Sequence, residues 1–407
     1  NLCYTKKQEG GEIMNFVFIS PQFPKTYWNF CDRLKRRGVN VLAIGDTPYY
    51  ELSDQLIQSV TEYYRVDNME DYDQVYRAMG FFIHKYGKID WLESNNEYWL
   101  EMDAKLRTDF NIKTGMQTNH IDEFKHKSVM KDYYKKAGVK SARYHLASTY
   151  EKGKQFINEV GYPVVVKPDN GVGAAKTYRI DDDEGLKQFY DELGDIPYIM
   201  EEYVNGLIIS FDGIANSKRE ILFKTSHVFP DPIMNVVNDQ KHLAYYSLRE
   251  IPKELNELGE RVVKTFDTQG RFFHCEFFQL LEDKPGLGKK GEYVGLEVNM
   301  RPPGGYTPDM MNYANDIDVY SIYADMVCHD NSDYDRMQRP YHCVYASRRD
   351  GNHYQHSHQE VMDKYYRHMV MCERMPDILA GAMGNQMYTA RFTTLEEVQE
   401  FIQFVHA

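Results

Sequence analysis

Short apolar runs alternate with stretches of helical spacing along the first part of the chain. Residues 15–20 and 39–45 have the apolar composition of buried strands, and residues 26–37 between them have the pattern of a helix. A third apolar run covers residues 89–92. Strands that alternate with helices form parallel sheets covered by helices. The pattern therefore predicts an α/β domain over residues 14–118, with the polar residues 1–13 as an extension outside the fold.

From residue 119 the pattern changes to runs of neighbouring strands. Residues 207–214 and 220–228 predict an antiparallel pair, and residues 272–281 and 293–300 predict a second hairpin. Such strands after an α/β opening indicate a separate α+β unit. Further predicted elements are helices at 121–137, 255–267 and 395–405, the last with a Thr394–Glu397 capping box, and strands at 162–168 and 198–204. We place this unit at residues 119–330 and expect residues 331–407 to complete it.

Composition limits the classes of partner. The formal charge of −13 over 407 residues leaves no excess of basic residues to neutralise nucleic-acid phosphates. No run approaches the roughly 20 apolar residues that span a bilayer. The six cysteines are scattered and form no CxxC pair, which is typical of reduced thiols. We expect a cytoplasmic protein without nucleic-acid or membrane partners.

Acidic side chains recur on one face of the second predicted hairpin. Alternate side chains of a strand share a face, so Glu297, Asn299 and Arg301 point the same way. If the two strands pair, Glu276 on the preceding strand can meet Glu297 across the sheet. Facing carboxylates repel each other unless a cation lies between them, and Mg²⁺ prefers oxygen ligands. The pattern therefore predicts a magnesium site; a salt-bridge cluster around Arg301 is the alternative.

The turn after this strand, Arg301-Pro302-Pro303-Gly304-Gly305, suits an anion. Prolines stiffen the turn, and the two glycines let backbone N–H groups approach a ligand closely. Arg301 can hold a phosphate or a carboxylate in a fork. We predict an anion site here in preference to a plain Pro/Gly turn.

A phosphate site is predicted after the strand at 162–168. This strand delivers Lys167 to its end, and the small residues that follow allow backbone N–H groups to cover phosphates. The segment is neither a P-loop nor a dinucleotide fingerprint. On the strand at 198–204, Glu201 and Glu202 mark either a plain surface strand or a hinge whose backbone reads an adenine edge.

Polar residues also follow the strand at 89–92. Ligands of parallel sheets bind at the carboxyl ends of strands. Ser20, Asn95, Asn96 and Glu97 are therefore candidates to line a site, with ordinary loop residues as the alternative.

Together and in this order, these motifs resemble those of the ATP-grasp superfamily, which includes biotin carboxylases, D-alanine–D-alanine ligases and amino-acid ligases. The resemblance covers residue 14 to the mid-300s. It rests on a lysine in the helix before Ala137-Gly138-Val139, the Val-Lys-Pro strand and its loop, the Glu-Glu-Tyr-Val hinge, a lone glutamate on a strand, and Glu-x-Asn-x-Arg. It implies an N-terminal Rossmann-like α/β domain, a lid over about residues 126–200, and a C-terminal domain with an antiparallel sheet, with ATP between the last two.

The resemblance also implies roles for individual residues. Arg301 and Lys167 would act on the transferring phosphoryl group and the phosphates, with Lys127 at the α-phosphate. Glu276 and Glu297 would share two Mg²⁺ ions, which Mn²⁺ can replace, and Asn299 would hold the second ion. Glu201 would take the adenine amino group, and Glu97, Asn95, Gly304 and Gly305 are candidates for binding the substrate. ATP would also contact Gly171, Gly173, Ala174, Ala175, Lys176, Glu202, Tyr203 and Val204.

One position departs from the family pattern. Many relatives carry an acid two residues after the hinge glycine, where it holds the ribose, whereas Leu207 and Ile208 follow Gly206 here. Asp212 is the candidate replacement.

The resemblance implies a ligase that activates a small carboxylate or amino acid as an acyl phosphate for attack by an amine, releasing ADP and phosphate. Phosphoryl transfer needs positioning and charge neutralisation, so no covalent enzyme intermediate is expected. The alternatives are carboxyphosphate chemistry, as in biotin carboxylase or carbamoyl phosphate synthetase, and a nucleotide-binding scaffold without turnover. His353, His356 and His358 could form a transition-metal site, although a solvated loop is favoured. A homodimer is left open.

Overall fold

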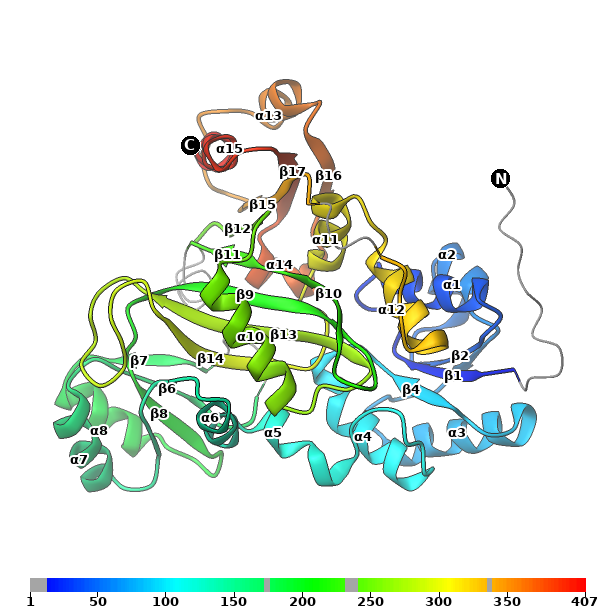
Figure 1. Cartoon of the computed structure of the whole chain (residues 1–407), viewed down its shortest axis with the longest axis horizontal. Coiled ribbons are helices and arrows are strands. Elements are labelled where there is room, and N and C mark those ends of the chain that lie inside the picture. The colour runs from blue at the N-terminus through cyan, green and yellow to red at the C-terminus, as the bar shows by residue number, and fades with distance from the viewer. Residues whose placement is uncertain (1–12, 172–175, 231–240, 335–338) are drawn as a thin grey trace. The chain divides into compact units, whose positions relative to one another are not determined.

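The computed structural model describes residues 13–171, 176–230, 241–334 and 339–407 (Figure 1). The chain forms two compact units that divide between Thr118 and Asn119. Among the described residues, the first unit contains one sheet and the second contains two, and each unit has its own apolar core. No helix within the described ranges is long and apolar enough to cross a bilayer.

The first unit is a four-stranded parallel sheet with helices packed against it, which confirms the predicted α/β class. Its elements are β1 (Asn15–Ile19), α1 (Trp28–Arg36), β2 (Asn40–Gly45), η1 (Tyr49–Glu51), α2 (Asp54–Ser59), β3 (Glu62–Arg65), α3 (Tyr72–Tyr86), β4 (Trp91–Glu93), η2 (Glu97–Trp99) and α4 (Leu100–Asp109). The strand order is β3-β2-β1-β4, and Val17, Leu42 and Phe82 share its core. Since β3 lies at the sheet edge, it needs no apolar run, and the sequence pattern did not reveal it.

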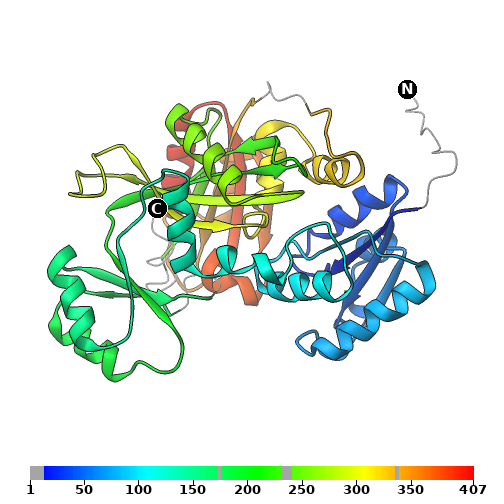
Figure 2. The same cartoon turned by 60° about the horizontal axis from the view of Figure 1, so that its bottom comes forward.

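The second unit contains a small antiparallel sheet of order β5-β8-β6-β7. Its elements are β5 (Tyr144–Leu146), α7 (Tyr150–Val160), β6 (Val164–Pro168), β7 (Tyr178–Ile180), α8 (Asp183–Asp191) and β8 (Tyr198–Glu202). Both helices lie on one side of the sheet (Figure 1 and Figure 2), where Val164, Val166 and Met200 form a buried core. Strand alternation therefore turns Lys167 and Glu201 to the opposite face.

A nine-stranded sheet forms the rest of this unit. Its strands are β9 (Gly206–Ala215), β10 (Ile221–Thr225), β11 (His227–Phe229), β12 (Ala244–Ser247), β13 (Arg271–Leu280), β14 (Tyr293–Asn299), β15 (His342–Arg348), β16 (Met369–Arg374) and β17 (Gln386–Phe392). The order is β14-β13-β9-β11-β12-β15-β17-β16, with β10 paired to β9. Both predicted antiparallel pairs, β9–β10 and β13–β14, are present.

Helices pack along this sheet. They are α10 (Lys253–Thr265), α11 (Thr307–Asn315), α12 (Val319–His329), α13 (His358–Tyr365), α14 (Asp377–Met383) and α15 (Leu395–His406). α10 lies over β9 and β13 (Figure 1). The predicted capping box of Thr394 and Glu397 starts α15.

The helix predicted over residues 121–137 is wrong in one respect, because the structure divides it. A short η3 (Thr118–His120) and α5 (Asp122–Lys125) are followed by extended backbone at His126 and then by α6 (Lys127–Lys136). The cause is Asp169, whose carbonyl accepts from the Lys127 N–H at 2.9 Å and whose carboxylate accepts from the Ser128 N–H at 2.8 Å. A partner this far along the chain cannot be inferred from local spacing.

Replacement of Gly259 by alanine tests how closely α10 packs on β9. A Cβ at this position would lie 2.3 Å from the buried ring of Phe211. We expect Gly259→Ala to lower the free energy of unfolding by about 1–3 kcal/mol, because overpacking forces the ring or the helix to shift. Urea unfolding measures this.

Gly185→Ala in α8 is the matched control. Its Cβ would meet neighbours only at 3.5 Å, so we expect unchanged or slightly higher stability, by at most about 1 kcal/mol. Equal stability of the two variants would contradict the close packing of α10.

Candidate functional site

The two acidic strands pair in the predicted register. In the β13–β14 hairpin, Glu276 lies directly opposite Glu297, and His274 lies directly opposite Asn299. Directly opposed side chains share one face of a sheet. The two carboxylates, the Asn299 amide and the His274 ring are therefore presented together, as the sequence predicted for the first three.

A cationic side chain lies beside each of these carboxylates. The Lys127 Nζ is 3.4 Å from Glu297 Oε1, and the His274 Nε2 is 3.6 Å from Glu276 Oε1. Burial alone would lower the pKa of His274, but the Asp212 and Glu276 carboxylates together outweigh burial and raise this pKa to about 9. Positive charge thus lies beside each of the two facing acids, an arrangement that lowers their mutual repulsion.

Asp212 cannot hold a ribose, which corrects the candidate named from the sequence. Its side chain is fully buried on β9 and holds two histidines: Oδ1 lies 2.6 Å from His274 Nδ1, and Oδ2 lies 2.7 Å from His227 Nδ1. Burial would raise the pKa of Asp212, but the two imidazoles hold it well below its usual range. Asp212 therefore orients His274, which in turn lies beside Glu276.

Three charged side chains form a second cluster. Lys167 and Glu201 lie on the face of the small sheet opposite α7 and α8, and Lys131 reaches them from α6. The Glu201 carboxylate lies 2.8 Å from Lys167 Nζ and 2.5 Å from Lys131 Nζ. Burial would raise the pKa of Glu201, but Lys131 and Lys167 outweigh burial and lower it to about 2. Burial lowers the pKa of Lys131, yet the short distance between the charged groups establishes an ion-pair network with one negative and two positive members.

Sequence reasoning missed Lys131. It lies four residues after Lys127, one turn further along α6, so the two ammonium groups leave the same face of the helix. That spacing was the available signal. The first turn of α6 is held by Asp169, and the Lys127 Nζ also donates to the Gly171 carbonyl at 3.1 Å. α6 therefore carries one lysine toward Glu297 and the other toward Glu201.

The structure places the remaining predicted nucleotide residues as follows. Glu202 is buried on the other face of β8, where Arg143 grips its carboxylate through two nitrogens at 3.0 and 2.6 Å. Tyr203 and Val204 continue from β8, and Lys176 is exposed. The predicted Gly173, Ala174 and Ala175 lie outside the described residues.

Arg301 is half-buried after β14, and its Nη1 donates to the Pro302 carbonyl at 3.0 Å.

The predicted substrate residues of the first unit follow β4. Asn95 is buried with a positive φ of 53°, and its carbonyl accepts from the Tyr27 hydroxyl at 2.8 Å. Glu97 starts η2 and is half-buried. In the second unit, Gly305 has a φ of 62°, a conformation that favours glycine in the predicted anion turn.

The donor set of the β13–β14 hairpin fits Mg²⁺. Two carboxylates and one amide oxygen are the hard oxygen ligands that this ion prefers, with phosphate oxygens and water completing its shell.

Within the described ranges no group of three or more His, Cys, Asp or Glu side chains could hold a metal ion. His356 stacks on Phe404, with ring centroids 3.6 Å apart, and His358 Nδ1 lies 2.9 Å from the Tyr388 hydroxyl.

Similarity to known sequences is partial. No family model matches the chain. The phosphoribosylamine–glycine ligase of Clostridium acetobutylicum is 32% identical over 196 residues, which are 43% of this chain and 44% of that protein. The C-terminal section of the carbamoyl phosphate synthase large chain from Aquifex aeolicus is 21% identical over 193 residues, 46% of this chain. The chain spans only 34% of that section's length.

Solved structures match over nearly the whole chain. The L-amino acid ligase from Bacillus licheniformis superposes with a TM-score of 0.73 at 14% identity, covering 97% of each chain. The biotin carboxylase domain of the Hydrogenobacter thermophilus 2-oxoglutarate carboxylase, solved as a dimer with MgADP, ADP and bicarbonate, gives 0.68 at 15% identity, covering 96% of this chain and 89% of that chain. These likenesses confirm the fold that the motifs predicted.

Replacement of Glu201 tests the ion-pair network. Glu201→Gln leaves two ammonium groups buried side by side, so we expect a loss of about 3–5 kcal/mol in the free energy of unfolding at pH 7. The folded pKa of about 2 lies below the ordinary value of 4.5, so stabilisation by Glu201 is complete above pH 4.5 and is lost as the pH falls toward 2. The difference between wild type and variant should therefore shrink in acid, as urea unfolding from pH 7 to pH 3 measures.

Glu260→Gln is the control, because Glu260 pairs with Lys224 at the surface, at 2.7 Å. Its loss should change stability by less than about 1 kcal/mol. A Glu201→Gln difference that does not change with pH would contradict the network.

Proposed function

We propose that this chain belongs to the ATP-grasp superfamily and is a ligase that uses ATP and Mg²⁺ to join a carboxylate to an amine. The observation that carries the proposal is the opposition of Glu276 and Glu297, with Lys127 of α6 beside Glu297 and Lys167 of β6 paired with Glu201. The likeness to an L-amino acid ligase over the whole chain supports the reaction class.

The proposed roles follow from the charges. Lys127 and Lys167 would bind the phosphates of ATP, and Glu276, Glu297 and Asn299 would hold Mg²⁺. Bound Mg²⁺ would neutralise phosphate charge and align the terminal phosphoryl group for transfer. Lys131 would keep Glu201 ionised when Lys167 turns toward phosphate, because Glu201 has both lysines as partners. Glu201 as the adenine ligand remains a prediction from the resemblance.

A carboxylate does not react with an amine directly, because its oxygen is a poor leaving group. Transfer of the phosphoryl group to one carboxylate oxygen makes that oxygen a good leaving group, and attack by the amine nitrogen then expels phosphate. Arg301 would neutralise the charge that develops during both steps. No side chain needs to form a covalent bond.

The substrate side of the proposal rests on the predicted residues. Asn95 and Glu97 would hold an ammonium group, and Arg301 with the Gly304–Gly305 turn would hold a carboxylate. Amino acids or similar small carboxylates are therefore the proposed substrates. A cytoplasmic location belongs to the same proposal and rests on the scattered cysteines of the sequence.

Mg²⁺-dependent release of ADP and phosphate, measured against amino acids, dipeptides, small carboxylates and bicarbonate, tests the reaction. We expect release that needs an acid together with an amine. Release with bicarbonate alone would favour carboxyphosphate chemistry, the second candidate, which the likeness to a biotin carboxylase domain supports. AMP as the product would contradict an acyl phosphate.

Glu297→Gln tests the metal site in two ways. We expect ADP release to fall by about 100-fold or more, because charge stabilisation of the transferring group is lost. Calorimetry should show weaker binding of Mg-ADP. Glu257→Gln, an exposed position on α10, is the control and should leave both readouts unchanged; equal effects of the two variants would contradict the assignment.

A further inference from the structure

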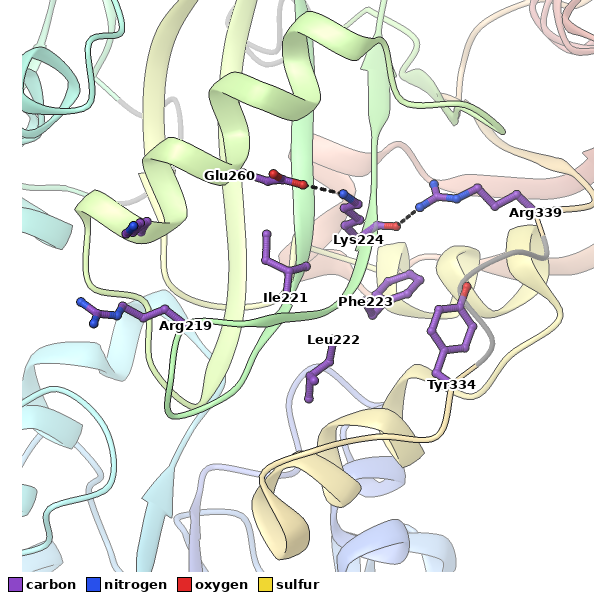
Figure 3. A pocket seen from close by; sticks show the side chains of 9 residues that line it. Arg219, Ile221, Leu222, Phe223, Lys224, Glu260, Tyr334 and Arg339 are labelled. Atoms are coloured by element: carbon purple, nitrogen blue, oxygen red, sulfur yellow. Dashed lines mark hydrogen bonds and ion pairs between the residues drawn. The ribbon is translucent and has the colours of Figure 1, made fainter.

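A cavity of about 360 Å³ lies in the second unit, lined by residues of β10 and α10 together with Arg219, Tyr334 and Arg339. In Figure 3, Lys224 and Glu260 meet above Ile221 and Phe223, with Arg339 on one side and Arg219 on the other. None of the residues proposed to bind ATP, Mg²⁺ or substrate lines this cavity. The cavity is therefore separate from the residues of the proposed reaction.

The charge of the cavity is opposite to that of the chain. Four cationic side chains line it, Arg219, Lys224, Lys264 and Arg339, against one acidic side chain, Glu260. The chain as a whole carries a formal charge of −13. Clefts lined by one sign of charge concentrate ligands of the opposite sign. A small anion is the ligand class that this lining attracts.

Two of the four cations have acidic partners. Lys224 Nζ lies 2.7 Å from Glu260, and Arg219 Nη1 lies 2.9 Å from Asp267. Among the described residues, no acidic side chain pairs with Lys264 or Arg339. As far as the described residues show, two positive charges of the cavity are thus uncompensated, which matches the charge of a dianion.

Arg339 is held in place by the backbone. Its Nη2 donates to the Lys224 carbonyl at 2.5 Å, which fixes the guanidinium beside strand β10. Burial lowers the pKa of Arg339, so the folded structure carries this charge at a desolvation cost that no described carboxylate offsets. A guanidinium that is already oriented loses little freedom when it binds an anion.

The cavity also has an apolar wall. The rings of Phe223 and Tyr334 meet edge to face, with centroids 5.5 Å apart. The volume lies in the range of small-molecule sites, which combine apolar walls with a few charged groups. The lining therefore suits a small molecule with an apolar part and a phosphate group.

We propose that this cavity is a binding site for a small organic phosphate, held by Arg339 and Lys264 over the Phe223–Tyr334 wall. Phosphate is favoured over a single carboxylate, because its two negative charges match the two uncompensated cations. The site is distinct from the proposed nucleotide site and does not depend on the reaction assigned above.

Inorganic phosphate is the probe for the test, at constant ionic strength, with binding measured by calorimetry and by the shift in thermal midpoint. Because phosphate can also occupy the proposed nucleotide site, the wild type is compared with Lys167→Met. We expect saturable binding that persists in Lys167→Met. Binding that is absent from wild type, or lost in Lys167→Met, would overturn the proposal.

Charge changes at the cavity complete the test. Lys264→Glu should weaken phosphate binding by about tenfold or more, because an attraction becomes a repulsion at close range. Lys253→Glu makes the same charge change at the other end of α10, where the side chain is exposed to solvent. Because solvent and salt screen its charge, it should leave phosphate binding within about twofold of wild type. Arg339→Gln should also weaken phosphate binding by about tenfold or more, because the guanidinium is lost. Since Arg339 also donates a hydrogen bond to the backbone of β10, circular dichroism checks that this variant folds. Phosphate binding that Lys264→Glu leaves intact, or that Lys253→Glu weakens equally, would refute the site.

Discussion

The ion pairs of Glu201 hold the charged centre of the second unit together. One buried carboxylate binds lysines from two different elements, β6 and α6, and β8 itself supplies the carboxylate. A buried ammonium group without such a partner is strongly destabilising. The position of α6 is therefore fixed at its first turn by Asp169 and in its middle by Glu201. From that fixed helix Lys127 reaches Glu297, so the small sheet and the nine-stranded sheet present their charges to one another.

The opposed carboxylates of β13 and β14 would be unstable without neighbouring positive charge. Lys127 supplies it on one side and His274 on the other, and His274 is held by Asp212 from β9. The charges thus run through three adjacent strands and onto α6. Asp212 orients His274, and His274 in turn stabilises Glu276. Both oxygens of Asp212 are therefore paired with histidines and are not open to a nucleotide. The residues of the proposed nucleotide and metal site thus stabilise one another without a ligand.

Much of this could be predicted because it depends on local pattern. The apolar runs gave most of the strands, and alternation along β13 and β14 placed Glu276, Glu297 and Asn299 on one face. What failed depends on distant partners. The break at His126 arises from Asp169, the occupation of Asp212 arises from two histidines on other strands, and the role of Lys131 arises from Glu201. Spacing along a sequence shows which residues share a face of a helix or strand, but it does not show which side chain of another element will contact that face.

The order of the nine-stranded sheet has a consequence for how the chain can be divided. β15, β16 and β17 all come from residues after 340, and β15 pairs directly with β12. A fragment ending near residue 330 would leave β12 as a sheet edge with unpaired amide and carbonyl groups, which is a template for pairing between chains. The apolar side chains of Ala244 and Tyr245 on β12, which now pack against residues after 340, would lose that cover as well. The strands after residue 340 therefore cover the edge of β12, and we expect fragments without them to aggregate.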